Sequence, residues 1–393
     1  MSLRHISHNK DIQQLLRAGL GVSTNNGHLL VSHVPFRDAS GQISYGTLVS
    51  PLELAGNDTV PPKRHDVFWT GGQPHDESGP LPGIVANAQP QDLGGGMTAQ
   101  MQFSVHPGSQ AAPQDYRDLF HKMTTYIARI SGPAQELQPD VTAYCSPPVE
   151  DNDPDSPFLY LDTASARAGT DTLNDRIRGQ AIAIIGLGGT GSYVLDLVAK
   201  APVTTIRIID GDIALTHNAF RSPGAMSLSQ LENQPKKVDH LNGVYSRLRT
   251  GIEAHPTMLD ETNLHLLDSI DFAFLCLDSP AAKRPIVRRL ESTGVPFIDV
   301  GMGLRVASAG LTGHIRTTLS DPGDRFTFHD VAGFGDPTDH DHVYASNIQI
   351  AELNAINAAL AVIAWKRYNS FYYPGQTSRS SMYHLTSDQL AHD

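Results

Sequence analysis

Cysteine is scarce in this sequence, whose 393 residues include only Cys145 and Cys276. No Cys-x-x-Cys pair occurs, which excludes a cysteine zinc site and argues against a disulfide framework. Basic blocks are missing too, since 29 Lys and Arg stand against 41 Asp and Glu and give a formal net charge of −12. We therefore expect neither nucleic acid nor an anionic membrane surface among the partners.

Long apolar runs are also absent. The N-terminal segment MSLRHISHNK lacks the apolar stretch of a secretory signal. The most apolar helix candidate, residues 348–365, contains Gln349, Glu352, Asn354 and Asn357, which excludes a membrane span. We expect a cytoplasmic protein, and its 40% of hydrophobic residues suffices for the cores of two domains.

The chain divides into parts of different pattern. Strand-like segments at 28–36, 43–50, 66–72 and 97–105 precede an amphipathic helix at 115–130. They predict a small α+β accessory domain over residues 1–145. The Pro-rich and acidic segment SPPVEDNDPDSP, residues 146–157, predicts a linker.

Apolar strands alternate with helices between residues 158 and 373. This alternation predicts an α/β domain of Rossmann type, with a mostly parallel sheet and helices on both faces. Residues 374–393 are expected to form a C-terminal tail that can add a strand. The predicted strands cover 180–186, 204–210, 271–278 and 295–301, and the predicted helices cover 190–200, 236–248, 280–293 and 348–367.

A glycine-rich turn joins the first strand and helix of this domain. Gly186, Gly188, Gly189 and Gly191 form a GxGGxG element. Glycine permits a tight turn close to phosphate, and the N-terminus of the next helix offers unpaired N–H groups to the anion. Asp210 ends the following strand, where it can accept a hydrogen bond from a ribose hydroxyl. A nucleotide site is therefore predicted, although the turn alone suits NAD or FAD as well as ATP.

Three downstream segments decide between these nucleotides: DGDIALTHNAFRSPGA, NQPKKVDHL and FLCLDSPAAKR. Together with the glycine turn they resemble the ubiquitin-activating-enzyme superfamily, of the ThiF/MoeB/HesA kind, over about residues 158–373. The resemblance implies a bacterial adenylyltransferase that carries an extra N-terminal domain.

The resemblance implies roles for five side chains. Asp210 matches a ribose-binding aspartate, and Asn218 and Arg221 match residues that face the ATP phosphates. Lys236 matches a phosphate-binding lysine, and Asp278 matches the aspartate that holds Mg²⁺ and is essential for adenylation. ATP and Mg²⁺ are the implied cofactors. Attack of a carboxylate on the α-phosphate brings two anions together, so cations and a metal are the groups that this chemistry needs.

These residues also have structural alternatives. Arg221 and Lys236 can be solvated surface cations, and Asp278 can be the N-cap of the helix that follows it. Three residues depart from the family motif and leave the details of the phosphate contacts open: Thr216, His217 and Ser222.

An arginine ahead of the glycine turn is a further candidate. Related enzymes are dimers in which such an arginine reaches the ATP of the partner. Arg167 is the candidate here, with Arg176 and Arg178 as alternatives. The resemblance therefore implies a homodimer.

The catalytic cysteine of many relatives is missing, because the matching loop, residues 317–346, contains none. Cys276 is expected to pack as a small hydrophobe. The enzyme then either stops at the acyl-adenylate or passes the acyl group to a hydroxyl. Ser346 is the candidate for this oxyester, with His340 and His342 as bases, although Ser346 can equally cap the next helix.

The resemblance implies ATP-dependent activation of the C-terminal carboxylate of a ubiquitin-like protein that ends in glycine. Such enzymes act in bacterial ubiquitination-like pathways, often in defence against phage, and a conjugating-enzyme-like protein is a further expected partner. The alternatives are a sulfur-carrier or tRNA-modifying adenylyltransferase, an NAD-binding Rossmann oxidoreductase, and a non-catalytic scaffold. Arg221, Lys236 and Asp278 in concert argue against the last two, and the acidic charge argues against tRNA.

Overall fold

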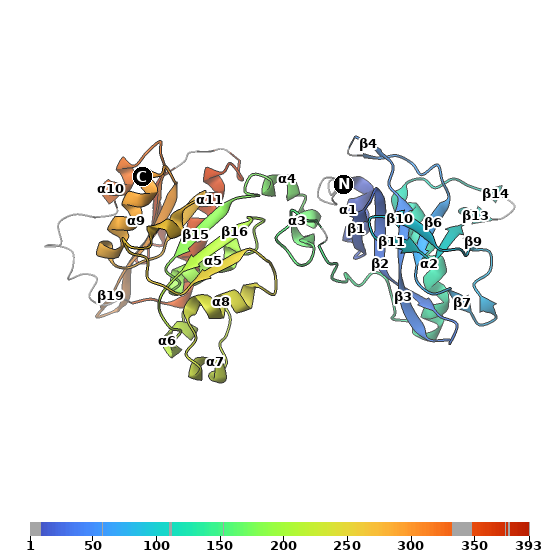
Figure 1. Ribbon diagram of the computed structural model, residues 1–393, viewed down its shortest axis with the longest axis horizontal. Coiled ribbons are helices and arrows are strands. Elements are labelled where there is room, and N and C mark those ends of the chain that lie inside the picture. The colour runs from blue at the N-terminus through green and yellow to red at the C-terminus, as the bar shows by residue number, and fades with distance from the viewer. Residues whose placement is uncertain are drawn as a thin grey trace. The chain divides into compact units, whose positions relative to one another are not determined.

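The computed structural model describes residues 9–56, 58–109, 112–151, 153–331, 348–373, 375 and 378–392. The chain forms two compact units (Figure 1). The first comprises Met1–Asp153 and Tyr160–Thr172, and the second comprises Pro154–Leu159 and Leu173–Asp393. No helix within the described ranges is long and apolar enough to cross a membrane.

The first unit contains one main sheet, several short strand pairs and three helices. The main sheet consists of β1 (Gly21–Asn25), β2 (His28–Arg37), β3 (Ile43–Pro51), β6 (Asp66–Thr70), β12 (Met101–Ser104) and β9 (Val85–Asn87). The short strands are β4 (Leu54–Ala55), β5 (Asp58–Thr59), β7 (His75–Asp76), β8 (Gly79–Pro80), β10 (Gln91–Gly94), β11 (Met97–Ala99), β13 (Gly108–Ser109) and β14 (Ala112–Pro113). The helices are α1 (Lys10–Arg17), α2 (Leu119–Leu137) and α3 (Thr163–Ala168).

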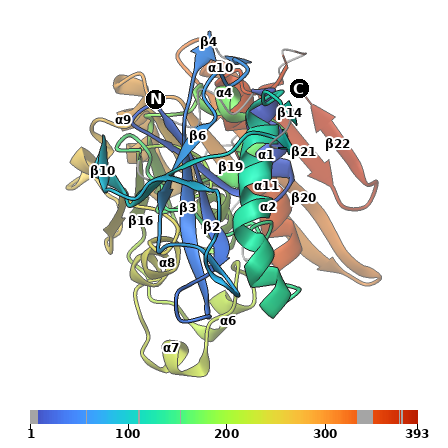
Figure 2. The ribbon, with the colours of Figure 1, turned by 90° about the vertical axis from the view of Figure 1, so that its right-hand side faces the viewer.

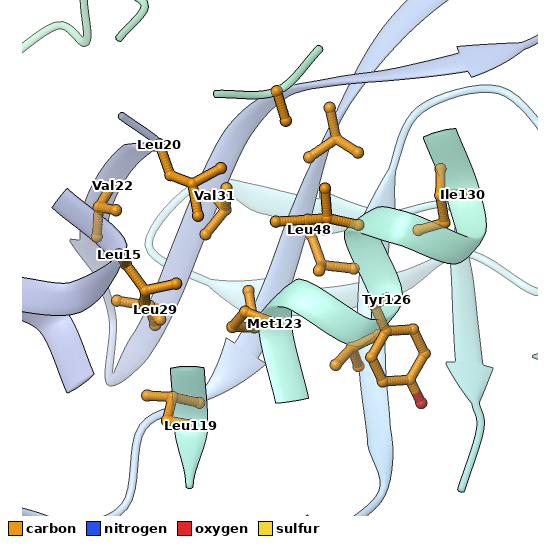
Figure 3. Close-up of a cluster of buried hydrophobic side chains, with 14 of the residues drawn as sticks. Leu15, Leu20, Val22, Leu29, Val31, Leu48, Leu119, Met123, Tyr126 and Ile130 are labelled. Carbon is orange, nitrogen blue, oxygen red and sulfur yellow. The ribbon is translucent and has the colours of Figure 1, made fainter. Parts of the chain in front are cut away.

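The main sheet of the first unit is antiparallel, in the order β1-β2-β3-β6-β12-β9. Helix α2 lies against β2 and β3 (Figure 2). Leu29 and Val31, two residues apart on β2, point with Leu48 and Met123 into one apolar core (Figure 3). This spacing is the period of two that a half-buried strand imposes. The predicted α+β architecture of the N-terminal part is confirmed.

The second unit contains an eight-stranded sheet and its covering helices. The strands are β17 (Ile252–His255), β16 (Thr205–Ile209), β15 (Ala181–Ile185), β18 (Phe272–Leu275), β19 (Phe297–Ala307), β20 (Gly310–Ser320), β21 (Ser380–His384) and β22 (Gln389–His392), in this spatial order. The main helices are α5 (Gly189–Val198), α8 (Lys237–Tyr245), α9 (Pro280–Ser292) and α11 (Ala351–Tyr368). Shorter helices are α6 (Thr216–Ala219), α7 (Leu228–Glu232), the 3₁₀ helix Leu264–Leu267 and α10 (Phe326–Val331), and α4 (Asp171–Asn174) lies across the boundary between the units.

The sheet of the second unit is parallel from β17 to β19 and antiparallel from β19 to β22. The four strands predicted for this domain correspond to β15, β16, β18 and β19. The tail contributes β21 and β22. The long hairpin of β19 and β20, which extends the sheet well beyond residue 301, was not predicted.

Helices cover both faces of the parallel part. Ile182 and Ile184 of β15 join the core formed with α5, α8 and α11. Ala183 and Ile185 of the same strand join the core formed with α9 and α10 on the other face. A strand buried on both faces reads as a continuous apolar run, which is why AIAII carries no polar residue. The predicted Rossmann-like α/β fold is confirmed.

The order of the strands reverses beside β15. From β15 the chain proceeds to β16 and β17 on one side, and then returns to β18 and β19 on the other. The loops at the carboxyl ends of β15 and β18 therefore diverge and leave a crevice, which is where open α/β sheets bind ligands.

Arg249, which follows α8, is a buried cation that supports this sheet. Only 1% of its surface is exposed. Its guanidinium donates hydrogen bonds to the carbonyl oxygens of Ala201 at 3.0 Å, Thr250 at 3.0 Å, and Val203. Two of these carbonyls belong to the connection between α5 and β16, so one side chain satisfies backbone groups that no strand or helix reaches.

Replacing Arg249 by leucine is expected to destabilise the protein by about 3 kcal/mol, because several buried carbonyl groups lose their donor at once. The thermal unfolding midpoint measures this loss. Arg247→Leu, at an exposed position two residues earlier, is the matched control. Equal midpoints for the two variants would show that the guanidinium contacts contribute nothing.

Candidate active site

The glycine turn after β15 has a backbone that only glycine permits. Gly186 has φ +87°, and its N–H donates to the carbonyl oxygen of Ile209 at 2.9 Å. A Cβ atom on Gly186 would lie 2.5 Å from the Cys276 carbonyl oxygen. A Cβ atom on Gly191 would lie 1.9 Å from the Gly186 carbonyl oxygen. The turn is thus as tight as the sequence pattern predicts, and it opens directly into α5.

Gly189 is required for a different reason. A Cβ atom there would lie 2.0 Å from Nδ2 of Asn354, a residue of α11 with no exposed surface. The Oδ1 atom of Asn354 accepts a hydrogen bond from the Thr190 hydroxyl at 2.8 Å. The amide of Asn354 therefore occupies the space that a side chain at position 189 would fill.

Asp210 fastens the glycine turn to the end of β16. Its Oδ2 atom accepts a hydrogen bond from the Leu187 N–H at 2.6 Å, and its Oδ1 atom accepts one from the Asp212 N–H at 2.8 Å. The residue is 7% exposed. Each carboxylate oxygen has a second lone pair, so these bonds leave capacity for a ribose hydroxyl.

A cavity of about 570 Å³ opens at the carboxyl ends of β15, β16, β18 and β19. Its volume lies in the range of small-molecule sites. It occupies the crevice where the strand order reverses. Its polar and charged lining residues are Thr190, Asp210, Asp212, Arg221, Lys237, Thr257, Asp260, Glu261, Asp278, Ser279, Gln349 and Asn357, and its glycines are Gly186, Gly188, Gly189 and Gly301.

Two cations line this cavity, and one of them differs from the lysine that the sequence indicated. Arg221 lines the cavity as expected. Lys236 is not among the lining residues, and its ammonium donates to the Gly211 carbonyl oxygen at 2.6 Å. Lys237 lines the cavity instead, 2.6 Å from Oδ2 of Asp212. The motif NQPKKVDHL offers two adjacent lysines, and the sequence analysis selected the other one.

Two buried donors near the cavity lack a hydrogen-bond partner within the described part of the chain. They are Nδ2 of Asn218 and Nε of Arg221. Asn218 is 5% exposed, and its Oδ1 atom accepts from the Leu215 N–H at 2.9 Å. Its side chain and Lys237 both line a small hollow of about 20 Å³. An unsatisfied buried donor costs about 1–3 kcal/mol, so such groups are usually kept for a ligand or a water.

Asp278 lies on the loop between β18 and α9 and lines the cavity from an exposed position. The alternative role as N-cap of α9 is wrong, because Ser279 holds that position and its hydroxyl accepts from the Ala282 N–H. The carboxylate oxygen Oδ2 of Asp278 accepts a hydrogen bond from Nε2 of Gln349 at 3.1 Å.

The donor set suits Mg²⁺ bound together with a nucleotide. The described residues contain no group of three or more His, Cys, Asp or Glu that could hold a metal by themselves. Mg²⁺ is typically held by one or two carboxylates plus substrate phosphates and waters. Asp278, one of several carboxylates that line the cavity, can supply such a ligand.

Cys276 lines the cavity without being an activated thiol. Burial raises the pKa of its thiol well above the ordinary value, and the nearby carboxylates of Asp299 and Asp278 raise it further. The thiolate is the nucleophilic form of cysteine, so the side chain is inert here. Cys145 is exposed and belongs to the first unit.

Several sequence candidates are not among the described residues that line the cavity. Arg167 is exposed on α3 in the first unit and is not among the lining residues. Arg176 donates to the Ser370 carbonyl oxygen, and Arg178 pairs with Asp175 at 3.2 Å. The role of Arg167 across a dimer stays a prediction. The oxyester candidates Ser346, His340 and His342 lie outside the described residues.

Amide side chains from α11 and the residues just before it were missed as site residues. Gln349 contacts Asp278, Asn354 contacts the glycine turn, and Nδ2 of Asn357 donates to the Gly301 carbonyl oxygen at 3.1 Å. The sequence pattern that could have identified them is the presence of polar amide residues on the buried face of an otherwise apolar helix. The sequence analysis used them only to exclude a membrane span.

Gly189→Ala is expected to weaken nucleotide binding at least about tenfold, because the new methyl group collides with Asn354 and displaces the turn. Asn354→Ala in the same chain should restore part of the loss. Titration of ATP binding by calorimetry gives both values, and Gly243→Ala, where a Cβ atom meets nothing within 4 Å, is the control. Strictly additive effects of the two substitutions would contradict the proposed collision.

Comparisons with known proteins agree with this site. The ThiF family model matches residues 162–372, and a domain of unknown function, DUF6791, matches residues 10–163. Ubiquitin-like modifier-activating enzyme 5 of Aedes aegypti is 24% identical over 191 residues, which cover 46% of each chain. The same enzyme of Oryza sativa subsp. japonica is 23% identical over 219 residues, 53% of this chain and 49% of that protein.

The chain thus spans about half the length of the curated relatives it matches. A crystal structure of E. coli MccB with MccA-N7isoASN has 17% identity and a TM-score of 0.47, over 59% of this chain and 69% of that one. The ThiF match covers more than half of the 393 residues and includes every residue that forms the cavity. The chain belongs to the ThiF family, within the adenylyltransferase superfamily that its motifs resemble.

Proposed function

We propose that this protein uses ATP to adenylate the C-terminal carboxylate of a ubiquitin-like protein. The observation that carries the proposal is a pair of buried donors, Nδ2 of Asn218 and Nε of Arg221, that have no partner among the described residues. They lie beside a cavity built on a glycine turn of the kind that binds phosphate. Donors of this kind suit an anion with several oxygens. A triphosphate is such an anion.

The proposed reaction forms a bond between a carboxylate oxygen of the substrate and the α-phosphorus of ATP. The bond from that phosphorus to the pyrophosphate oxygen breaks, and pyrophosphate leaves with the electron pair. The products are an acyl-adenylate and pyrophosphate. Two anions must meet, so catalysis depends on orientation and on charge stabilisation.

The residues of the cavity divide these tasks. The N-terminus of α5 presents N–H groups to phosphate, and Asp210 lies where a ribose would be held. Arg221 and Lys237 supply positive charge to the phosphates. Asp278 would hold Mg²⁺, which supplies further neutralisation of the phosphate charge when bound.

The grouping of Arg221, Lys237 and Asp278 favours adenylation over hydride transfer to NAD. Those three charges serve a reaction at phosphorus, whereas a nicotinamide reaction takes place far from the phosphates. A sulfur-carrier or tRNA-modifying enzyme would share the adenylation step and differ in the substrate. The relatives are ubiquitin-like modifier-activating enzymes, which favours a ubiquitin-like protein as substrate, and we propose one that ends in glycine.

The activated carboxyl group is proposed to leave the cavity without a thioester at Cys276, whose thiol is held protonated by burial. The acyl-adenylate then passes to a conjugating-enzyme-like partner or to a hydroxyl such as that of Ser346. We further propose that the protein acts as a homodimer in a bacterial ubiquitination-like pathway linked to defence.

ATP–pyrophosphate exchange tests the proposal, with a ubiquitin-like protein that ends in glycine as substrate. Exchange is expected for the native protein and a loss of at least about a hundredfold for Asp278→Ala. Lys237→Met should lose at least about a hundredfold in kcat/KM, because Lys237 lines the cavity. Lys236→Met, the adjacent lysine that binds a backbone carbonyl, should lose less than about tenfold.

The two lysine variants remove the same ammonium group at adjacent positions. A difference between them therefore reports the effect of a positive charge inside the cavity, separate from the loss of one positive charge by the protein as a whole. A larger loss of kcat/KM in Lys236→Met than in Lys237→Met would show that Lys236, and not Lys237, contacts the phosphates. No exchange by the native protein with any substrate that ends in a free carboxylate would refute adenylation as the function.

A further inference from the structure

The segment that leads into α11 reaches the mouth of the cavity. Gln349 lies two residues before the first residue of the helix and lines the cavity. Its Nε2 atom donates to Oδ2 of Asp278 at 3.1 Å, although the two residues are 71 positions apart in the sequence. Its Oε1 atom is 4.0 Å from where a Cβ atom on Gly188 would be. Gln349 therefore lies between the glycine turn and the Asp278 carboxylate.

Asp278 needs an external contact to hold its orientation. It is exposed and lies on a loop, one residue before the N-cap Ser279 of α9. The hydrogen bond from Gln349 is the contact that links this loop to the other side of the cavity. A carboxylate that is already oriented binds a metal more tightly, because less freedom is lost on binding.

The chemistry of the donor matters. An amide is neutral, so it fixes one carboxylate oxygen and leaves the negative charge that attracts a cation. A lysine or arginine in the same place would neutralise Asp278 and compete with the metal. Lys237, which also lines the cavity, pairs with Asp212, whereas the Asp278 carboxylate accepts the amide N–H of Gln349.

We propose that Gln349 is the positioning residue for the Mg²⁺–nucleotide site, acting through the carboxylate of Asp278. This inference rests on the proposed function and adds to it. The segment before α11 would then affect the affinity for Mg²⁺ through this hydrogen bond, and not only through its packing in the fold.

The test measures metal binding without turnover. Mg²⁺ is titrated into the full chain in the presence of a non-hydrolysable ATP analogue, and the thermal midpoint reports binding. Gln349→Met keeps the length of the side chain and removes the donor. The Mg²⁺ concentration for half-maximal stabilisation is expected to rise about tenfold, while the midpoint without ligand changes little. Glu352→Gln, on the exposed side of the first turn of α11, is the control and should match the native protein.

The outcomes separate this inference from the function beneath it. If the native protein is stabilised by Mg²⁺ and the nucleotide, but Gln349→Met has the same half-maximal concentration, the positioning role is refuted and adenylation stands. A lower midpoint without ligand, combined with an unchanged Mg²⁺ dependence, would show that Gln349 is only structural. If Mg²⁺ and the nucleotide do not stabilise the native protein, the proposed function fails and this inference fails with it.

Discussion

The contact between Gly189 and Asn354 is the constraint on which the rest of the site depends. The buried amide of Asn354 occupies the place of the missing side chain at position 189, so α11 lies directly against the first turn of α5. Because α11 is fixed there, Gln349 reaches Asp278 and Asn357 reaches the strand at Gly301. A larger residue at 189 would therefore disturb the phosphate turn, the Asp278 carboxylate and the floor of the cavity together.

The charges of the cavity explain how an acidic protein can bind a nucleotide. Asp210, Asp212 and Asp278 all line the space that a triphosphate would enter. All three carboxylates have partners: Asp210 accepts backbone N–H groups, Asp212 pairs with Lys237, and Asp278 accepts a hydrogen bond from Gln349. Arg221 and the N-terminus of α5 supply positive charge to this space. Asp278 is then the carboxylate that fits a metal. A carboxylate repels phosphate, whereas a metal ion bound to it would attract phosphate.

The parts of the fold that could be predicted are those whose signal is local. Apolar runs identified β15 and β18 because each strand is buried on both faces. The glycines at 186 and 191 were identified because their backbone must turn within a few residues. The choice between Lys236 and Lys237 could not be made in this way, since both follow one motif and only the end of β16 selects which one enters the cavity. The contact of Gln349 with Asp278 joins segments 71 residues apart, and no local pattern encodes it.

Cys276 shows that position inside a site does not by itself make a nucleophile. Its side chain lines the cavity, yet burial raises the pKa of the thiol, and Asp299 and Asp278 disfavour the thiolate further, while Lys283 opposes them. Asp299 pairs with both Lys283 and Arg316, which ties that cation to a carboxylate and limits its effect on the sulfur. Burial has the largest of these effects on the pKa of the Cys276 thiol, and the carboxylates add to it. A buried, protonated thiol is a poor acceptor, which supports the proposal that the acyl-adenylate passes to a group other than Cys276.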